Sequence, residues 1–195
     1  FAEDNNVVLS VAKGSYGYSY AEQKGLRYEL RDAAVLYEGS CGDNVIWKLH
    51  TDGVFKLEGT GPMTAYGSKT EVPWYNYRNL IKEVEIGKEI TSLSDFAFYK
   101  ETGLTKVTFE EGSVLESIGK QAFIGCSSLT EFDMPDTVTS VGTYLFSGCS
   151  SLTAVVLSDG LKSVPTRVFE NCGALASVYI PDGMTYIHPD AFAED

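Results

Sequence analysis

The stretch that decides the fold lies between residues 129 and 174, where two consecutive segments share one apolar pattern. Residues 129–151 read LTEFDMPDTVTSVGTYLFSGCSS, and residues 152–174 read LTAVVLSDGLKSVPTRVFENCGA. Both segments have apolar residues at the first, fourth and sixth positions, and both have a later Phe followed three residues on by a Cys. Self-similarity at a fixed period is the signature of a repeat architecture.

The same pattern extends from Ile81 to the end of the 195-residue sequence. Its units begin at Ile81, Leu104, Leu129, Leu152 and Leu175, so the spacings are 23, 25, 23 and 23 residues. The longer spacing reflects a two-residue insertion around Gly112 and Ser113. Every unit also has a second apolar pair, and five residues after it stands a Phe. These residues are Phe98, Phe123, Phe146, Phe169 and Phe192.

Each unit predicts one coil of a solenoid. The fourth and sixth positions alternate with polar ones, which is the period of a strand with one buried face. A strand this short cannot bury that face alone, but stacking the units forms a parallel sheet over a continuous core. We therefore predict a mostly β, right-handed leucine-rich-repeat solenoid at residues 80–195, with five repeats of about 23 residues and short 3₁₀ or helical turns on its convex side.

Residues 1–79 predict a small β-rich region that caps the first repeat, because terminal units of a solenoid need covering. Two apolar alternating segments flank Asp52-Gly53 and predict a hairpin at about residues 45–57. Trp74, Tyr75 and Tyr77 are expected to cover the first coil. Upstream, the alternation of aromatic and apolar residues predicts further strands within residues 7–37. The alternating residues are Tyr16, Tyr18, Tyr20, Leu26, Tyr28 and Leu30.

Composition argues against several classes of function. The net charge is −12, and no Lys/Arg cluster is present to neutralise phosphates, so we expect no nucleic-acid binding. No run approaches the roughly 18–20 apolar residues of a membrane span, so we expect no membrane insertion.

The sequence offers few groups for catalysis or for holding a metal. Cys126, Cys149 and Cys172 recur at one point of successive units, so we predict buried, reduced thiols that pack in the core. His50 and His188 lack a recognisable nucleophile partner and are expected on the surface. We therefore predict no enzyme, no cofactor and no metal site. Carboxylates at Glu85, Glu131 and Asp133 leave weak Ca²⁺ binding as a minor alternative.

Polar positions between the inward residues predict an outward, concave sheet face, which is the candidate binding site. Its predicted central column is Glu85, Thr108, Asp133, Val156 and Tyr179, and its flanking column is Glu83, Lys106, Glu131, Ala154 and Ser177. The face changes from acidic to apolar toward the C-terminal end. Val156 beside Tyr179 is a pairing typical of interface anchors.

Residues 119–129, GKQAFIGCSSL, resemble a unit of the BspA-like bacterial surface leucine-rich repeats, and the resemblance covers about residues 81–195. Residues 41–47, 59–63 and 73–75, with the Asp52-Gly53 turn, resemble the β-rich leader of such proteins. The first repeat departs from the pattern at Glu101, where later repeats have Cys.

The resemblance implies a secreted or cell-surface protein that acts in adhesion rather than catalysis. We expect a monomer that binds a host or community protein or glycan through the concave face. Two alternatives remain at this point. The chain is a structural spacer that projects other domains, or it binds carbohydrate, as a lectin or a glycan-directed enzyme, through its N-terminal aromatic residues.

Overall fold

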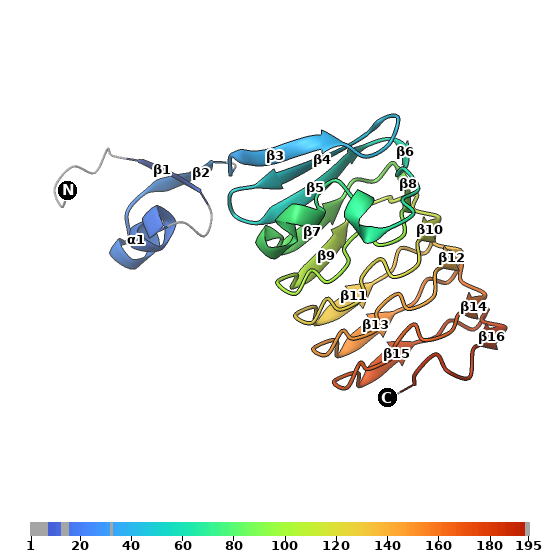
Figure 1. The fold of residues 1–195 in the computed structure, drawn as a ribbon. Coiled ribbons are helices and arrows are strands. Elements are labelled where there is room, and N and C mark those ends of the chain that lie inside the picture. Colours follow the sequence, from blue (N-terminus) through green and yellow to red (C-terminus); the bar gives the residue numbers. More distant parts are fainter. Residues whose placement is uncertain (1–7, 13–15, 32, 194–195) are drawn as a thin grey trace.

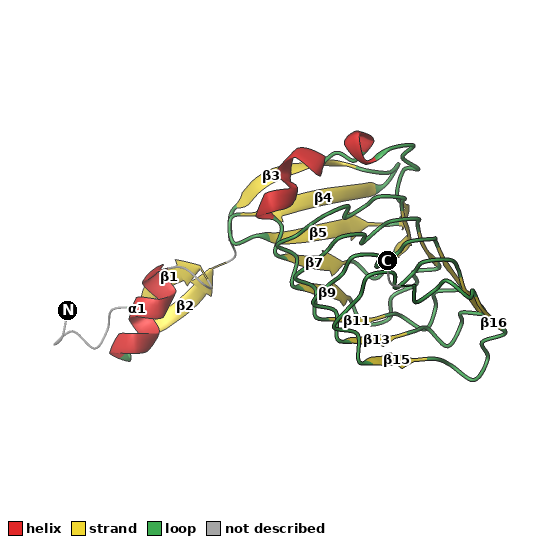
Figure 2. Ribbon diagram, turned by 60° about the horizontal axis from the view of Figure 1, so that its bottom comes forward, coloured by secondary structure: helices red, strands yellow, loops and turns green. Residues whose placement is uncertain are grey.

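The computed structural model describes residues 8–12, 16–31 and 33–193. From β5 onward the chain winds as a parallel β-solenoid whose coils stack from the cap to the last repeat (Figures 1 and 2). Each coil contributes one strand to the concave sheet, a shorter strand to a second sheet, and a turn on the remaining side. The predicted mostly β solenoid with a parallel sheet is confirmed.

Two sheets in succession form the concave face. The first has five strands in the order β3 (Val35–Ser40), β4 (Val45–His50), β5 (Val54–Gly59), β7 (Glu83–Ile86) and β9 (Lys106–Phe109). The second has three parallel strands in the order β11 (Glu131–Asp133), β13 (Ala154–Val156) and β15 (Ser177–Tyr179).

The second side of the solenoid is made by the apolar pair of each repeat. One parallel sheet contains β6 (Gly61–Pro62), β8 (Ile90–Leu93), β10 (Ser117–Ile118) and β12 (Ser140–Val141). A smaller one pairs β14 (Ser163–Val164) with β16 (Tyr186–Ile187). Their inward residues meet those of the concave strands, so a single core runs along the solenoid.

The third side is a series of turns, as predicted, but these turns are not 3₁₀ helices. One residue two positions before each of four repeat Phe residues has a left-handed backbone, which a helix cannot contain. The residues are Phe96, Gln121, Tyr144 and Arg167, with φ of 57–60°. This geometry directs N–H groups at the next coil: the N–H of Phe123 donates to Leu145 (3.0 Å), and that of Phe146 to Val168 (2.8 Å).

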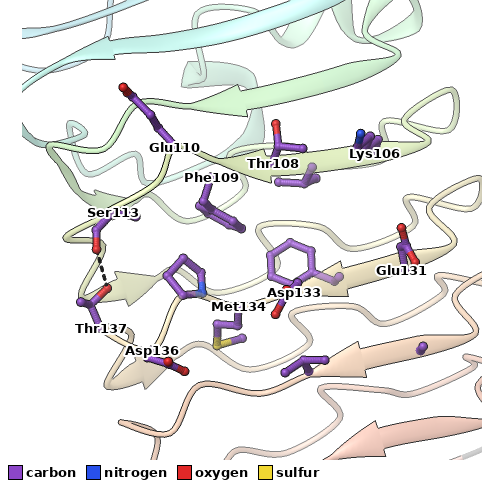
Figure 3. A pocket seen from close by; sticks show the side chains of 16 residues that line it. Lys106, Thr108, Phe109, Glu110, Ser113, Glu131, Asp133, Met134, Asp136 and Thr137 are labelled. Atoms are coloured by element: carbon purple, nitrogen blue, oxygen red, sulfur yellow. Dashed lines mark hydrogen bonds between the residues drawn. The ribbon is translucent and has the colours of Figure 1, made fainter.

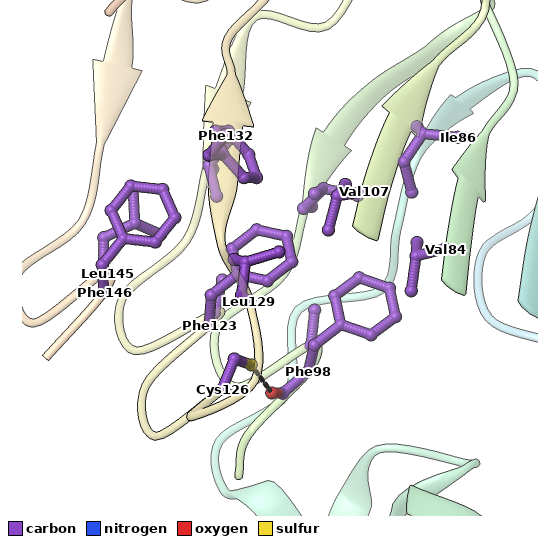
Figure 4. Packing of buried hydrophobic residues seen from close by; sticks show 14 of the residues in the cluster. Val84, Ile86, Phe98, Val107, Phe123, Cys126, Leu129, Phe132, Leu145 and Phe146 are labelled. Carbon is purple, nitrogen blue, oxygen red and sulfur yellow. Dashed lines mark hydrogen bonds between the residues drawn. The ribbon is translucent and has the colours of Figure 1, made fainter. Parts of the chain in front are cut away.

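The repeat Phe rings form a continuous stack through the core (Figure 4). Neighbouring rings are nearly parallel, and Phe146 lies 5.9 Å from Phe123 and 5.8 Å from Phe169 between ring centroids. Phe146 is completely buried, whereas Phe192 on the last coil is 44 % exposed. Burial of this ring therefore depends on a coil on either side.

The cysteines are reduced and buried, as predicted. The Sγ of Cys126 donates to the carbonyl of Phe98 at 3.2 Å (Figure 4). Cys149 and Cys172 repeat this contact with Phe123 and Phe146. The thiol is thus a small core group that also satisfies a buried carbonyl of the previous coil.

The cap extends the concave sheet and covers the first coil. β4 and β5 pair antiparallel around the turn at Asp52-Gly53, and β5 then pairs parallel with β7. Trp74 is completely buried against Phe55 and Phe98, and its Nε1 donates to the carbonyl of Ala97 at 2.7 Å. In later coils the equivalent carbonyl accepts a hydrogen bond from a backbone N–H of the preceding coil. Trp74 supplies this donor for the first coil, which no other coil precedes.

Glu101 occupies the position that Cys holds in later repeats, next to the cap. The residue is 1 % exposed, and its Oε2 has no hydrogen-bond partner. Burial raises the pKa of this carboxyl to about 9, and the charge of Arg78 offsets only part of the effect. The side chain is therefore a neutral carboxylic acid at neutral pH.

Residues 9–31 form a β–α–β unit to one side of the cap, where β1 (Leu9–Ala12) pairs parallel with β2 (Tyr28–Arg31) and α1 (Tyr16–Lys24) connects them (Figure 1). The strand predicted from Tyr16, Tyr18 and Tyr20 was wrong. Positions i and i+4 share a helix face, so Tyr16 stacks on Tyr20 (6.3 Å) while Tyr18 packs on Tyr28.

The Phe stack predicts that removing an inner ring destabilises the fold much more than removing a terminal ring. Phe146→Ala removes a fully buried ring between two others, so we expect a loss of about 3–5 kcal/mol in the free energy of unfolding. Phe192→Ala is the matched control and costs clearly less. Urea titration followed by circular dichroism measures both, and equal losses would contradict the stacking account.

The burial of the thiols predicts low reactivity. Burial raises the pKa of Cys172 to about 11 and that of Cys41 to about 12, and it raises the pKa values of Cys126 and Cys149 as well. The thiolate fraction at pH 8 is then about a thousandth or less. Iodoacetamide should leave the folded protein unlabelled and modify all four cysteines in urea; labelling of the folded chain at the rate of a free cysteine would refute this.

Glu101 predicts a specific dependence of stability on pH. Its pKa is about 9 in the folded state and near 4.5 when unfolded, so the folded state binds an extra proton between these values. Protonated Glu101 contributes fully to the free energy of unfolding below about pH 4.5. This contribution is lost as the pH rises toward 9, by at most about 1.4 kcal/mol per pH unit. Urea titrations at pH 5 and pH 8 should show a smaller decline in Glu101→Gln than in the wild type. Equal declines in the two proteins would contradict the prediction.

Candidate binding face

The concave face contains every residue predicted for the site. Sheet register places Lys56, Glu85 and Thr108 in one column on the first sheet, and Asp133, Val156 and Tyr179 in a column on the second. The flanking column contains Glu83 and Lys106, then Glu131, Ala154 and Ser177. Thr108 and Ala154 are half-buried and the other predicted residues are exposed.

The hairpin adds residues to this face that the sequence analysis did not include. Lys48 pairs with Glu58 at 2.6 Å, and Lys56 pairs with Glu85 at 2.9 Å. Lys48 and Lys56 alternate with buried residues along the two hairpin strands, so both lie on the outward side of the hairpin. Only the parallel pairing of β5 with β7, however, shows that they continue the face of the repeats.

The concave sheet is interrupted between β9 and β11, and a groove of about 730 Å³ lies at the break (Figure 3). The backbone N–H of Thr105 donates to the carbonyl of Lys82, and that of Thr153 donates to the carbonyl of Thr130. No equivalent hydrogen bond in the described chain connects Thr130 with Thr105. Beneath the break, the rings of Phe109 and Phe132 meet edge to face with centroids 5.7 Å apart.

Two features of the sequence coincide with this break. Phe132 occupies an inward position where the other four repeats have Val, so a larger side chain must fit between the same neighbours. The two-residue insertion around Gly112 and Ser113 lies at one end of the groove, where the Oγ1 of Thr137 donates to the carbonyl of Ser113 at 3.3 Å. The insertion was visible in the repeat spacing, but its effect on the sheet was not.

The groove is lined by more acidic than basic side chains. Glu110 accepts a backbone hydrogen bond from Lys88, and Asp136 accepts one from Asp159. The carboxylates of Glu131 and Asp133 point outward from β11 and make no hydrogen bond or ion pair within the described chain (Figure 3). Glu131 and Asp133 were predicted as site residues from the sequence. Glu110 and Asp136 were not, because they follow the strands.

The apolar end of the face lies beside the groove. Val156 is adjacent to Asp133 across the sheet and is 41 % exposed, and the next strand presents Tyr179, which is 50 % exposed. The hydroxyl of Tyr179 donates to Asp159 at 3.4 Å, and the charge of Asp159 raises the pKa of Tyr179. Tyr179 therefore remains a neutral phenol with an exposed ring.

The two histidines lie apart, one in the cap and the other in the last repeat. His50 is half-buried, and its Nδ1 lies 2.8 Å from the carbonyl of Ala33, so the prediction that it is a surface residue was wrong in part. His188 is half-buried as well and lies near Asp190. No group of His, Cys, Asp and Glu in the described ranges is arranged to hold a metal ion. Likewise, none of the described helices is long and apolar enough to cross a bilayer.

Comparison with solved structures places this architecture among bacterial leucine-rich-repeat proteins. A leucine-rich cell surface protein from Faecalibacterium prausnitzii is 26 % identical with a TM-score of 0.57, over 82 % of this chain and 47 % of that one. A leucine-rich-repeat protein from Bacteroides ovatus is 19 % identical with a TM-score of 0.49, over 78 % and 50 % of the two chains. A third, from Eubacterium ventriosum, is 18 % identical with a TM-score of 0.46, over 77 % and 61 %. This chain thus spans only about half to three-fifths of their lengths.

A search of curated proteins gives no significant match. The family model of the BspA type leucine rich repeat region, however, matches residues 72–195 in six copies. That stretch contains all five repeats identified in the sequence and begins within the cap, just before Trp74. The chain therefore belongs to the BspA-type leucine-rich-repeat family.

Proposed function

We propose that this chain is a non-enzymatic binding module of a secreted or cell-surface protein, and that its concave sheet contacts an extracellular protein or glycan. The observation that carries the proposal is the outward face of β7 to β15, where all of the predicted site residues except Thr108 and Ala154 are exposed. Its exposed Val156 and Tyr179 form an apolar area beside a groove, as interface anchors do. The similar Faecalibacterium protein is described as a cell surface protein, which supports the location.

A second candidate is glycan binding by the N-terminal unit. The ring of Tyr16 is 86 % exposed and stacks on Tyr20, which offers an aromatic surface for a sugar. A structural spacer, the remaining alternative, requires no ligand for either surface.

The test is a binding screen of the purified chain against extracellular-matrix proteins, mucin and a glycan array. We expect a specific ligand, and we expect Val156→Ala combined with Tyr179→Ala to weaken its binding at least about tenfold, because both anchors are lost. The matched control is Val114→Ala with Tyr186→Ala. These residues are 43 % and 53 % exposed and lie outside the concave strands.

Equal binding by the two double variants, with folding unchanged, would refute the concave face as the site. Loss of that binding in Tyr16→Ala with Tyr20→Ala would then assign it to the N-terminal unit. A folded chain that binds nothing in the screen favours the spacer.

A further inference from the structure

The groove between β9 and β11 differs from the rest of the concave face in its charge balance. Elsewhere on this face Glu58 and Glu85 are neutralised by Lys48 and Lys56, and Glu83 lies beside Lys106 across the sheet. At the groove Lys106 is the one basic side chain among the lining residues. The acidic lining residues are Glu110, Glu131, Asp133 and Asp136. This uncovered part of the sheet therefore complements a positively charged partner.

The two carboxylates without internal partners are spaced like side chains of an extended peptide. Glu131 and Asp133 lie on one face of β11, two residues apart, which corresponds to about 6.6 Å along a strand. Alternate side chains of any extended chain repeat at the same distance. Basic residues at positions i and i+2 of a peptide running along β11 thus meet both carboxylates.

The neighbouring strand supplies an apolar contact for the same peptide. Ala154 lies beside Glu131 and Val156 beside Asp133 across the sheet, and both line the groove. A basic side chain buries its aliphatic stem on such a surface while its charged head reaches a carboxylate. Arg fits better than Lys, because its planar guanidinium makes two hydrogen bonds to one carboxylate.

We propose that this groove binds an extended basic segment of a partner protein, in which Arg residues at alternate positions pair with Glu131 and Asp133. The proposal rests on the binding function proposed above and names the class of partner. Val156 and Tyr179 then contact the part of the partner that extends toward the last repeat. Strongly acidic partners are excluded from the groove by like-charge repulsion.

The test uses the whole chain and three fluorescein-labelled octapeptides in fluorescence anisotropy. The first alternates Arg and Ser, the second has the same composition with its four Arg residues in one block, and the third alternates Glu and Ser. We expect the alternating Arg peptide to bind most tightly, more weakly as salt is raised from about 50 to 300 mM, and the Glu peptide not to bind.

Matched variants separate the groove from the overall negative charge. Glu131→Gln with Asp133→Asn should weaken binding of the alternating Arg peptide about tenfold or more. Glu89→Gln with Glu116→Gln removes the same charge at exposed positions outside the groove and should change binding less than about twofold. Thermal unfolding checks that both variants keep the fold.

Equal losses in the two variants would overturn the proposal, because net charge alone would then attract the peptide. Equal affinity for the block peptide, or no binding of the alternating one, would overturn it as well. The proposed function fails separately: it is refuted if the chain binds nothing in the screen, or if the ligand found there is unaffected by the changes at Val156 and Tyr179.

Discussion

Each coil of this solenoid depends on its neighbours both to bury its apolar residues and to provide hydrogen-bond partners for its backbone. Its apolar residues are covered only when another coil lies on either side, as the contrast between Phe146 and Phe192 shows. Its backbone groups are satisfied across the same boundary, where the N–H of Phe146 donates to Val168 and the thiol of Cys172 donates to the Phe146 carbonyl. Left-handed turn residues are tolerated because they aim these donors at the next coil.

The same dependence explains the construction of the N-terminal end. The first repeat has no preceding coil, so β5 supplies the neighbouring strand and Trp74 supplies both an aromatic ring and the missing N–H donor. Glu101 is less well satisfied, because one oxygen of its carboxyl is buried with no partner. It is held as a neutral acid, which is the less costly form of a buried carboxyl.

Regular stacking makes a smooth sheet, and the groove is a local departure from that regularity. A Phe in place of Val at position 132 and two extra residues near Gly112 interrupt the backbone pairing at one boundary. The interruption lies where the face changes from paired charges to unpaired carboxylates and then to apolar residues. Shape and charge thus change together on the concave face, where the predicted site residues lie.

Periodicity within a coil was enough to predict the repeats, the inward residues, the Phe stack, the reduced thiols and the residues on the outward face. The prediction for residues 16–24 was wrong, since three tyrosines at alternate positions are compatible with a strand and also with a helix in which Tyr16 and Tyr20 share a face. Four features could not be predicted in this way. They are the left-handed turns, the capping bond of Trp74, the ion pairs of Lys48 and Lys56, and the groove beside Glu131 and Asp133. These features are set by contacts between neighbouring coils or with the cap, and the order of residues within a single coil does not specify them.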